Sequence, residues 1–446
     1  MTFRSAPLVI RLLLLVAGLS LCAGCDPCPS CSGSAKPTSS PTPAPNACLP
    51  SSSIAVLVQG TNATAYLPQG CWEEGGCGTG DRSVKVVSIE TSSGLNTGGA
   101  PASVATGNVP NSCSSNSKTG VTVCVANNTD VYLINGTTLT STLTSGATST
   151  EGFSGGGCYN CGVVVDSSIN KALITVGLET GGPGGYQLLD LGATPAFESP
   201  IPAGAETSEN VSIDPVRHLV LSPNEDADYQ IVNITTSTAA LFNNNLSGET
   251  EERPEFDSAA EDCTTGIALA TDEFTGNLFI ADLTQAVFTP GTPAGTWTDA
   301  ASQLVNFPEF TPGNETTGGL AAGTCGIAVA PGTHLGVVTG EYGGNLEGVF
   351  ELPATSGPGS GTPNFVDYVA FTVPNTPSEE EWSEGYDPHT VTAYVSPNSK
   401  KAYAVLENAD FSYVAVVDLQ GLLSAPRTGH TVNNPLPADL VTFIAE

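Results

Sequence analysis

The sequence predicts an all-β protein, a seven-bladed β-propeller that follows a signal peptide and a disordered linker. Three observations lead to this prediction. Gly and Pro are abundant, with 50 and 33 residues in 446, whereas only 13% of the chain is charged. No long segment of amphipathic helical period follows the N-terminus. Hairpin-like segments recur along the chain, each followed by a third apolar run, at a spacing of roughly fifty to sixty residues.

Residues 1–24 are predicted to be a signal peptide. Arg4 and Arg11 flank the start of the apolar run LLLLVAGLSL, which ends in small residues before Cys25. A basic region, a short apolar region and a small-residue cleavage site are typical of an exported chain, and the run is too short to span a membrane comfortably. The alternatives at this point are a lipoprotein signal and an ordinary secretory signal.

The residues Cys22-Ala23-Gly24-Cys25 resemble the lipobox of bacterial lipoproteins. In that family the invariant cysteine receives a diacylglycerol and becomes the mature N-terminus. The resemblance implies that Cys25 is lipidated, although Cys22 stands where the family usually has Leu. It also implies an extracytoplasmic protein that is anchored to a bacterial membrane through its lipid, in the periplasm or at the cell surface.

Residues 25–47 are predicted to be a tether. The segment is rich in Pro, Ser and Thr and has no apolar face to bury, so it should be disordered or extended. Its Cys28 and Cys31 have a zinc-like spacing, but one such pair without a second favours a disulfide in an oxidising compartment.

Residues 48–446 are predicted to be the propeller domain. The clearest unit, Thr324–Leu352, reads as an apolar strand, a Pro-Gly turn, a second strand, a Gly-rich loop and a third strand. Such a unit leaves one sheet face uncovered, and packing blade on blade around an axis covers it. An array of five-stranded jelly rolls or sandwiches is the structural alternative. The other six units are centred near Thr61, Ser117, Ser167, Pro215, Asp272 and Pro397.

The C-terminal strand is predicted to close the ring. After the seventh unit, the segment Asp439–Ala445 is a strand with no unit of its own, and the first unit looks incomplete in its middle. We therefore expect this segment to join the first blade as an outer strand.

The segments GIAVAPGTH, YVSPNSKKAYAVL and YVAVVDL resemble the YVTN-type propeller repeats of bacterial surface and periplasmic proteins. Lactonase-like and amine-dehydrogenase-like seven-bladed propellers have similar repeats. The resemblance covers units three to seven better than units one and two. It implies a fold and no single function, because these relatives include lactonases, quinoprotein subunits and plain binding scaffolds.

The cysteines of an exported protein are expected to form disulfides. Proximity favours two pairs, Cys71–Cys77 and Cys113–Cys124, and Cys158 and Cys161 form a CxxC that could pair locally or be redox-active. The repeat alignment places Cys325 and Cys161 at the same position, with Cys263 two residues earlier in its own unit. On that register, Cys263–Cys325 is a candidate disulfide between neighbouring blades.

The same register gathers four candidate ligand-binding residues at one mouth of the central channel: Glu209, Asp262, Asp387 and His389. Carboxylate and imidazole groups that converge near an axis suit a divalent cation or a cationic ligand. The alternative is that they are solvated loop residues. His218 and His334 occupy equal places in their units, which favours a structural role such as a hydrogen bond to the turn backbone.

Two acidic runs, Glu249–Asp262 and Glu379–Asp387, are predicted to lie in connections between blades. Together with Asp257 and Glu341 they suggest a calcium-binding rim, with solvated loops as the alternative. The sequence contains no metal or cofactor motif, and calcium is the only cofactor that these runs suggest. The formal net charge of −32 argues against nucleic-acid binding.

No G-x-S-x-G elbow, P-loop or H-E-x-x-H motif occurs, so no catalytic residue is predicted. The sequence favours a lipid-anchored envelope domain that binds or scaffolds a protein or glycan. The alternative is a lactonase-like propeller hydrolase with a metal or an acidic/His site at the channel mouth.

Overall fold

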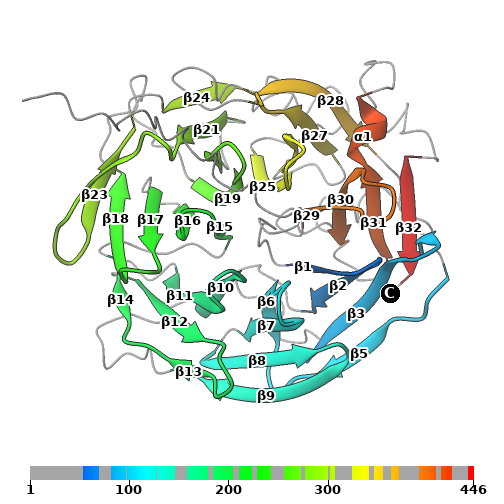
Figure 1. Ribbon diagram of the computed structural model, residues 1–446, viewed down its shortest axis with the longest axis horizontal. Helices are drawn as coiled ribbons and strands as arrows, with labels where there is room; N and C mark the ends of the chain where they lie inside the picture. The colour runs from blue at the N-terminus through cyan, green and yellow to red at the C-terminus, as the bar shows by residue number, and fades with distance from the viewer. Residues whose placement is uncertain are drawn as a thin grey trace, which may run out of the picture. The chain divides into compact units, whose positions relative to one another are not determined.

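A computed structural model defines the positions of a large part of the chain (Figure 1). The described residues are 54–69, 82–96, 98–126, 128–145, 158–178, 184–203, 210–223, 229–242, 256–272, 277–299, 302–306, 324–340, 346–354, 363–370, 391–407, 413–423 and 440–445. All belong to one of two compact units, Pro43–Glu446, and none to the other, Met1–Thr42. The predicted signal peptide, Cys25 and the predicted tether therefore lie outside the described residues. No helix within these ranges is long and apolar enough to cross a membrane.

Within Pro43–Glu446, seven β-sheets form a seven-bladed β-propeller, which confirms the predicted fold class (Figure 1). The first strand of each sheet contacts the first strand of the next, and the seventh contacts the first, so the ring is closed. We number the sheets as blades one to seven in chain order. Their first strands are β1 (Ala55–Gln59), β6 (Pro110–Ser115), β10 (Cys158–Asp166), β15 (Ser212–Asp214), β19 (Phe256–Asp262), β25 (Thr324–Ala330) and β29 (Val391–Val395).

The other strands of blades one to four extend each sheet away from its first strand. In blade one they are β2 (Asn62–Pro68), β3 (Ser83–Thr91), β4 (Gly94–Leu95) and β5 (Ala102–Ala105). In blade two they are β7 (Val121–Ala126), β8 (Asp130–Asn135) and β9 (Thr138–Thr144). In blade three they are β11 (Lys171–Leu178), β12 (Gly185–Asp190), β13 (Ala196–Phe197) and β14 (Ile201–Pro202). In blade four they are β16 (Leu219–Pro223), β17 (Tyr229–Asn233), β18 (Thr238–Phe242), β23 (Gly295–Thr298) and β22 (Val287–Thr289).

Blades five to seven are four-stranded. Blade five continues with β20 (Ile267–Asp272), β21 (Asn277–Asp282) and β24 (Gln303–Asn306). Blade six continues with β26 (Leu335–Gly340), β27 (Leu346–Glu351) and β28 (Asn364–Ala370). Blade seven continues with β30 (Ala402–Glu407), β31 (Tyr413–Asp418) and β32 (Val441–Ala445). A short helix, α1 (Leu419–Leu422), follows β31, and the Asp418 side chain caps it by accepting from Gly421 N.

The hydrophobic core of the described part lies between the blades. Seven clusters of buried apolar side chains occur, and each draws its members from two neighbouring blades. Because the side chains of a strand alternate between its two faces, each blade contributes to the cluster on either side of it. A fully buried Val, Leu or Ile side chain stabilises a fold by about 1.5–3 kcal/mol, so contact between blades is the main source of stability.

The ring closes differently from the prediction. The C-terminal strand β32 pairs with β31 inside blade seven, so the expectation that it joins the first blade is wrong. The physical reason is that β3 of blade one already has its outer edge paired, with β4 near Thr91 and with β5 near Val84. Blades one and seven instead close the ring by packing face to face, through a cluster that contains Ile54, Val405 and Ile444.

A buried carboxylate adds polar contacts to this closure. Glu90, from β3, is 1% exposed and accepts hydrogen bonds from three side chains of blade seven. Ser396 Oγ lies 2.6 Å and Asn398 Nδ2 lies 2.8 Å from Oε1, and Tyr394 OH lies 3.2 Å from Oε2. We call this contact the closure seam.

Blade five also differs from the prediction. The hairpin assigned from the sequence near Asp272 consists of the second and third strands, β20 and β21. The first strand is β19, which lies within the run Glu249–Asp262 that was expected to be an acidic connection. Every residue of β19 is buried, so its carboxylates are inside the protein and are not solvated.

Blade five also extends blade four. The hairpin β22–β23 leaves blade five after β21, and its strand β23 pairs in parallel with β18 of blade four. Blade four therefore has six strands, and β22 is its edge. Trp297 of β23 is fully buried and donates from Nε1 to the Tyr229 carbonyl oxygen at 2.9 Å. This hairpin fastens blade five to the outer part of blade four.

Candidate functional site

The seven turns that join first to second strands are similar, and those of blades two, three, four, five and seven share one side-chain contact. A polar side chain at the end of the first strand accepts hydrogen bonds from backbone N–H groups of the turn, as an Asx or Ser turn does. Asp214 Oδ1, for example, accepts from the N–H groups of Val216 and Arg217 at 2.8 and 2.9 Å. Each turn also contains a residue with positive φ: Gly60, Gly120, Asn170, His218, Gly266, His334 and Lys400.

The two histidines at these positions contact the preceding blade. His218 Nδ1 lies 2.6 Å from Asp166 Oδ2, which joins blade four to blade three. His334 Nδ1 contacts Asp262 Oδ2 in the same way and joins blade six to blade five. The expected structural role is therefore correct in kind, but the partner is a carboxylate of the neighbouring blade and not the turn backbone.

Other residues make equivalent contacts at the neighbouring turns. Asn116 Nδ2 donates to Asn170 Oδ1 at 2.7 Å and joins blades two and three. Between blades four and five, Arg217 Nη1 lies 2.5 Å from Asp214 Oδ2, and its guanidinium covers Gly266. The φ of +81° at Gly266 favours glycine, and a Cβ there would lie 2.6 Å from Arg217 Nη2, so the guanidinium would have to shift to admit one. These polar side chains are thus used to hold the ring.

The Asp262–His334 pair shifts both ionisation equilibria. The hydrogen bond to Asp262 raises the pKa of His334, against the opposing effect of burial. Burial alone would raise the pKa of Asp262, but hydrogen bonds from His334 and Thr264 outweigh it and hold that pKa below its ordinary value. Both shifts favour the charged pair at neutral pH and support a bridge between blades.

The predicted channel-mouth residues fall into two groups. Glu209, Asp387 and His389 lie outside the described residues, as does Glu341. Asp262 lies at the turn end of β19, whereas Asn210, next to Glu209 in sequence, is bridged to Ser258 near the other end of that strand. Asp262 therefore ends a first strand and does not precede one as the sequence register had it, and its predicted convergence with the other three lies outside the described residues. Within the described ranges, no group of three or more His, Cys, Asp or Glu side chains could hold a metal ion.

Glu261 was missed by sequence reasoning. It is 3% exposed, and neither of its carboxylate oxygens has a hydrogen-bond partner among the described residues. Burial, with the charges of Asp214 and Asp262, raises the pKa of Glu261 well above its ordinary value, and Arg217 opposes this only in part. This environment therefore disfavours the charged form of the carboxyl group. Its one sequence signal is its position beside the small pair Ala259-Ala260 in a strand.

The cysteine predictions have mixed outcomes. Cys113 and Cys124 form a disulfide across the β6–β7 hairpin, at directly opposed positions, as proximity favoured. Cys263 is disulfide-bonded, with a partner outside the described side chains. It follows β19 in the turn, whereas Cys325 stands at the start of β25, so these two cysteines do not share the register that suggested their pairing. Cys158 and Cys161 lie in β10, and Cys71 and Cys77 are outside the described residues.

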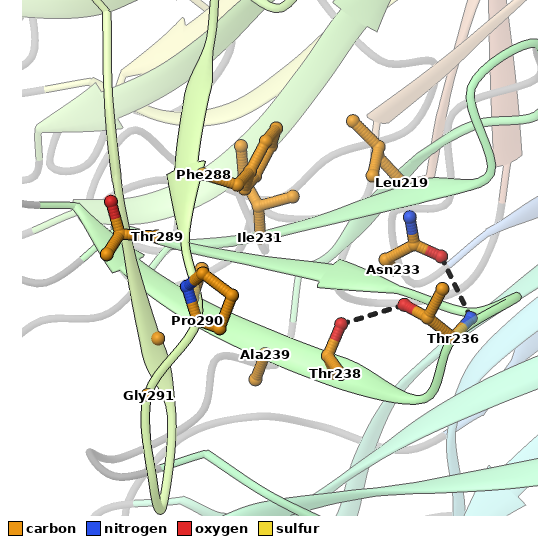
Figure 2. Close-up of a pocket in the computed structure, with 12 residues that line it drawn as sticks. Leu219, Ile231, Asn233, Thr236, Thr238, Ala239, Phe288, Thr289, Pro290 and Gly291 are labelled. Carbon is orange, nitrogen blue, oxygen red and sulfur yellow. Dashed lines mark hydrogen bonds between the residues drawn. The ribbon is translucent and has the colours of Figure 1, made fainter.

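A groove of about 290 Å³ lies beside the β22–β23 hairpin, and we call it the interblade groove (Figure 2). Blade four forms one side of it and the hairpin, whose chain comes from blade five, forms the other. From blade four the lining residues are Leu219, Ile231, Asn233, Thr236, Thr238, Ala239 and Ala240. From the hairpin they are Phe288, Thr289, Pro290, Gly291 and Gly295.

Asn233, Thr236 and Thr238 of the β17–β18 turn supply most of the polar side chains of the interblade groove, and Thr289 of β22 adds one from the hairpin. Asn233 Oδ1 accepts from Thr235 N and Thr236 N, both at 3.0 Å, and also from the Thr235 hydroxyl. The hydroxyls of Thr236 and Thr238 are 2.8 Å apart (Figure 2). Phe288, at 43% exposure, supplies an aromatic ring to the opposite side. No sequence pattern indicated this site, because it depends on the pairing of β18 with β23.

Comparison with known proteins identifies no family. No protein-family model matches this chain, and no curated protein sequence matches it. Among solved structures, it is similar to a chain from a crystal structure of a mitotic checkpoint complex, with 11% identity and a TM-score of 0.48. The similarity covers 88% of this chain and 96% of that chain. Similarity at this level says nothing about function.

Proposed function

We propose that this protein is a lipid-anchored β-propeller at a bacterial cell envelope and that it binds or scaffolds a protein or glycan there. Its N-terminal sequence supports the anchor, because Cys25 ends a lipobox-like motif and a Pro/Ser-rich segment separates it from the folded domain. Its YVTN-like repeats support an extracytoplasmic location. The tether gives the propeller reach from a lipid surface.

One observation carries the binding role, namely the composition of the interblade groove. An aromatic ring, aliphatic side chains, three threonines and one amide line it, and none of the lining side chains is ionisable. Concave sites with mainly apolar walls and a few placed polar groups are typical binding sites. In contrast, His218 and His334 of the turns are paired with carboxylates of neighbouring blades, and Asp214 is paired with Arg217 of its own turn.

The anchor is tested by metabolic labelling with a radioactive fatty acid. The wild-type protein should incorporate label and the Cys25→Ser variant should not. Label that persists in the variant, or that is missing from both proteins, contradicts the anchor.

The binding role is tested with the purified protein immobilised on beads. Envelope polysaccharide and envelope protein fractions are applied separately, and the retained material is measured. Wild type should retain one fraction, Phe288→Ala should lose that retention, and Val287→Ala should keep it, because Val287 is exposed but does not line the groove. Equal retention by the two variants would show that the groove is not the binding site.

A further inference from the structure

The size of the interblade groove limits what can occupy it. Its volume of about 290 Å³ is at the low end of the range for small-molecule sites. A helix or a folded surface needs a longer groove. The occupant is therefore a small ligand or one protruding unit of a larger ligand.

The charge around the groove selects a neutral occupant. The chain has a formal net charge of −32, which disfavours an anionic ligand. A cationic ligand would be attracted over a distance, but the groove has no carboxylate among its lining residues to pair with it. Placing an unpaired charge in a half-enclosed apolar site is costly.

The hydrogen-bonding groups of the groove suit a ligand that both donates and accepts. The Thr236 and Thr238 hydroxyls bond to each other, and each has further capacity as an acceptor. Asn233 uses its Oδ1 atom within the turn, which fixes the orientation of the amide and leaves the two N–H groups of Nδ2 as donors. In Figure 2 this nitrogen faces away from the turn, on the side of Leu219.

The Phe288 ring supplies the complementary apolar surface. It belongs to the edge strand β22 and faces the groove opposite the turn hydroxyls. A ligand with hydroxyls at its edge and C–H groups on its face matches both sides, and a sugar ring has this character. We propose that the interblade groove binds a neutral saccharide unit; this inference rests on the proposed function and names its ligand class.

The test is a binding titration of the full chain in detergent with defined neutral sugars. The probes are glucose, galactose, mannose and N-acetylglucosamine with their disaccharides, and galacturonate serves as the anionic comparison. At least one neutral sugar should bind below about 10 mM, and galacturonate should bind about tenfold more weakly than that sugar or not at all. Calorimetry and saturation-transfer NMR measure both.

Variants locate the site. Phe288→Ala should weaken binding about tenfold or more, whereas Phe288→Trp, which keeps a ring, should retain it. Thr236→Val with Thr238→Val should also weaken binding, and Val287→Ala should not. Thermal unfolding checks that each variant is folded. Equal affinity in Phe288→Ala and Val287→Ala would overturn the assignment.

Three outcomes separate this inference from the proposed function. Competition by a free sugar for retained envelope polysaccharide supports both. Retention of an envelope protein that depends on Phe288, with no sugar binding at about 10 mM, overturns the saccharide and leaves the binding role standing. Retention that is unaffected by Phe288→Ala, together with no sugar binding, overturns both.

Discussion

Two blade interfaces contain a buried glutamate, and they differ in whether its carboxylate has hydrogen-bond partners among the described residues. At the closure seam, Glu90 of blade one accepts hydrogen bonds from three side chains of blade seven. At the interface of blades four and five, neither carboxylate oxygen of Glu261 has a partner among the described residues. The two side chains are almost equally buried, at 1% and 3% exposure. Burial alone therefore does not decide what a carboxylate contributes.

The difference shows that the two interfaces are held by different forces. The closure seam combines apolar packing with a satisfied polar network, which suits the place where the two ends of the ring must stay together. The interface of blades four and five depends on aromatic packing of Tyr229, Phe279 and Trp297 and on the β22–β23 hairpin. The interblade groove lies at this second interface, beside the β22–β23 hairpin, which follows blade five in the chain but pairs with blade four.

The largest expected effect comes from Trp297→Ala. The side chain is fully buried, and its Nε1 donates to the Tyr229 carbonyl oxygen. Its removal should lower the free energy of unfolding by about 3–5 kcal/mol in chemical denaturation, from the lost burial and the cavity that is left. The matched Val287→Ala change on the same hairpin should stay within about 0.5 kcal/mol. A small loss for Trp297→Ala would show that the hairpin does not hold this interface.

The next effect tests the closure seam. Glu90→Ala should lower the free energy of unfolding by about 3 kcal/mol, because hydrogen bonds to a carboxylate are strong and two of the donors, those of Tyr394 and Ser396, stay buried. Ser396 and Asn398 keep other hydrogen bonds, so the loss is less than the sum of three contacts. Unfolding unchanged within about 0.5 kcal/mol would show that Glu90 does not contribute to ring closure.

Substitution of Glu261 should change the free energy of unfolding in the opposite direction. Glu261→Met replaces a buried group that has no described partner with an apolar side chain of similar size, and should raise the free energy of unfolding by about 1–3 kcal/mol. The raised pKa of Glu261 means that its contribution to stability decreases as pH rises from about 4.3 towards the folded value. The gain from Glu261→Met should therefore increase over that range. A loss of stability as large as that of Glu90→Ala would contradict the comparison.

The smallest effect concerns the Asp262–His334 pair. Because the pKa of His334 is raised in the folded protein, its contribution is complete below about pH 6.5 and is lost as pH rises through the folded value. His334→Asn should cost about 0.5–1 kcal/mol at pH 5.5 and close to nothing at pH 9, measured by denaturation. Asparagine is the matched replacement because Asn170 already holds the equivalent positive-φ position. A cost that does not change with pH would show that the pair is not ionic.

The fold could be predicted because a short stretch of sequence identifies the hairpin of most blades. An apolar run, a turn rich in Pro, Asn, Asp or Ser and a second apolar run identify the hairpins at Pro215, Pro331 and Pro397 from short-range sequence alone. The first strand of blade five was predicted to be a connection because its sequence, FDSAAED, carries three carboxylates. Nothing in the local sequence shows that Asp262 bonds to its own turn and to His334, 72 residues away. Ring closure was misread because the pairing of β3 with β5 is not visible in the sequence.

The candidate site could be predicted only in part. The equal places of His218 and His334 were recognisable, but their partners lie in other blades, 52 and 72 residues away. The interblade groove depends on the parallel pairing of Ala240 with Gly295, which no periodicity encodes. Polar residues in the turns suggested ligand binding, whereas the structure uses them to join blades and leaves neutral residues to form the groove.

We expect the interface of blades four and five to receive a ligand and the closure seam to fasten the ring without contacting that ligand. Hydrogen–deuterium exchange of the full chain, with and without a neutral saccharide that binds, tests it most directly. Exchange should slow in peptides that cover 233–242 and 287–298 and should be unchanged in those that cover 83–91 and 391–407. Slowed exchange centred on Asp387 and His389, with none at the hairpin, would contradict the claim and favour a channel-mouth site.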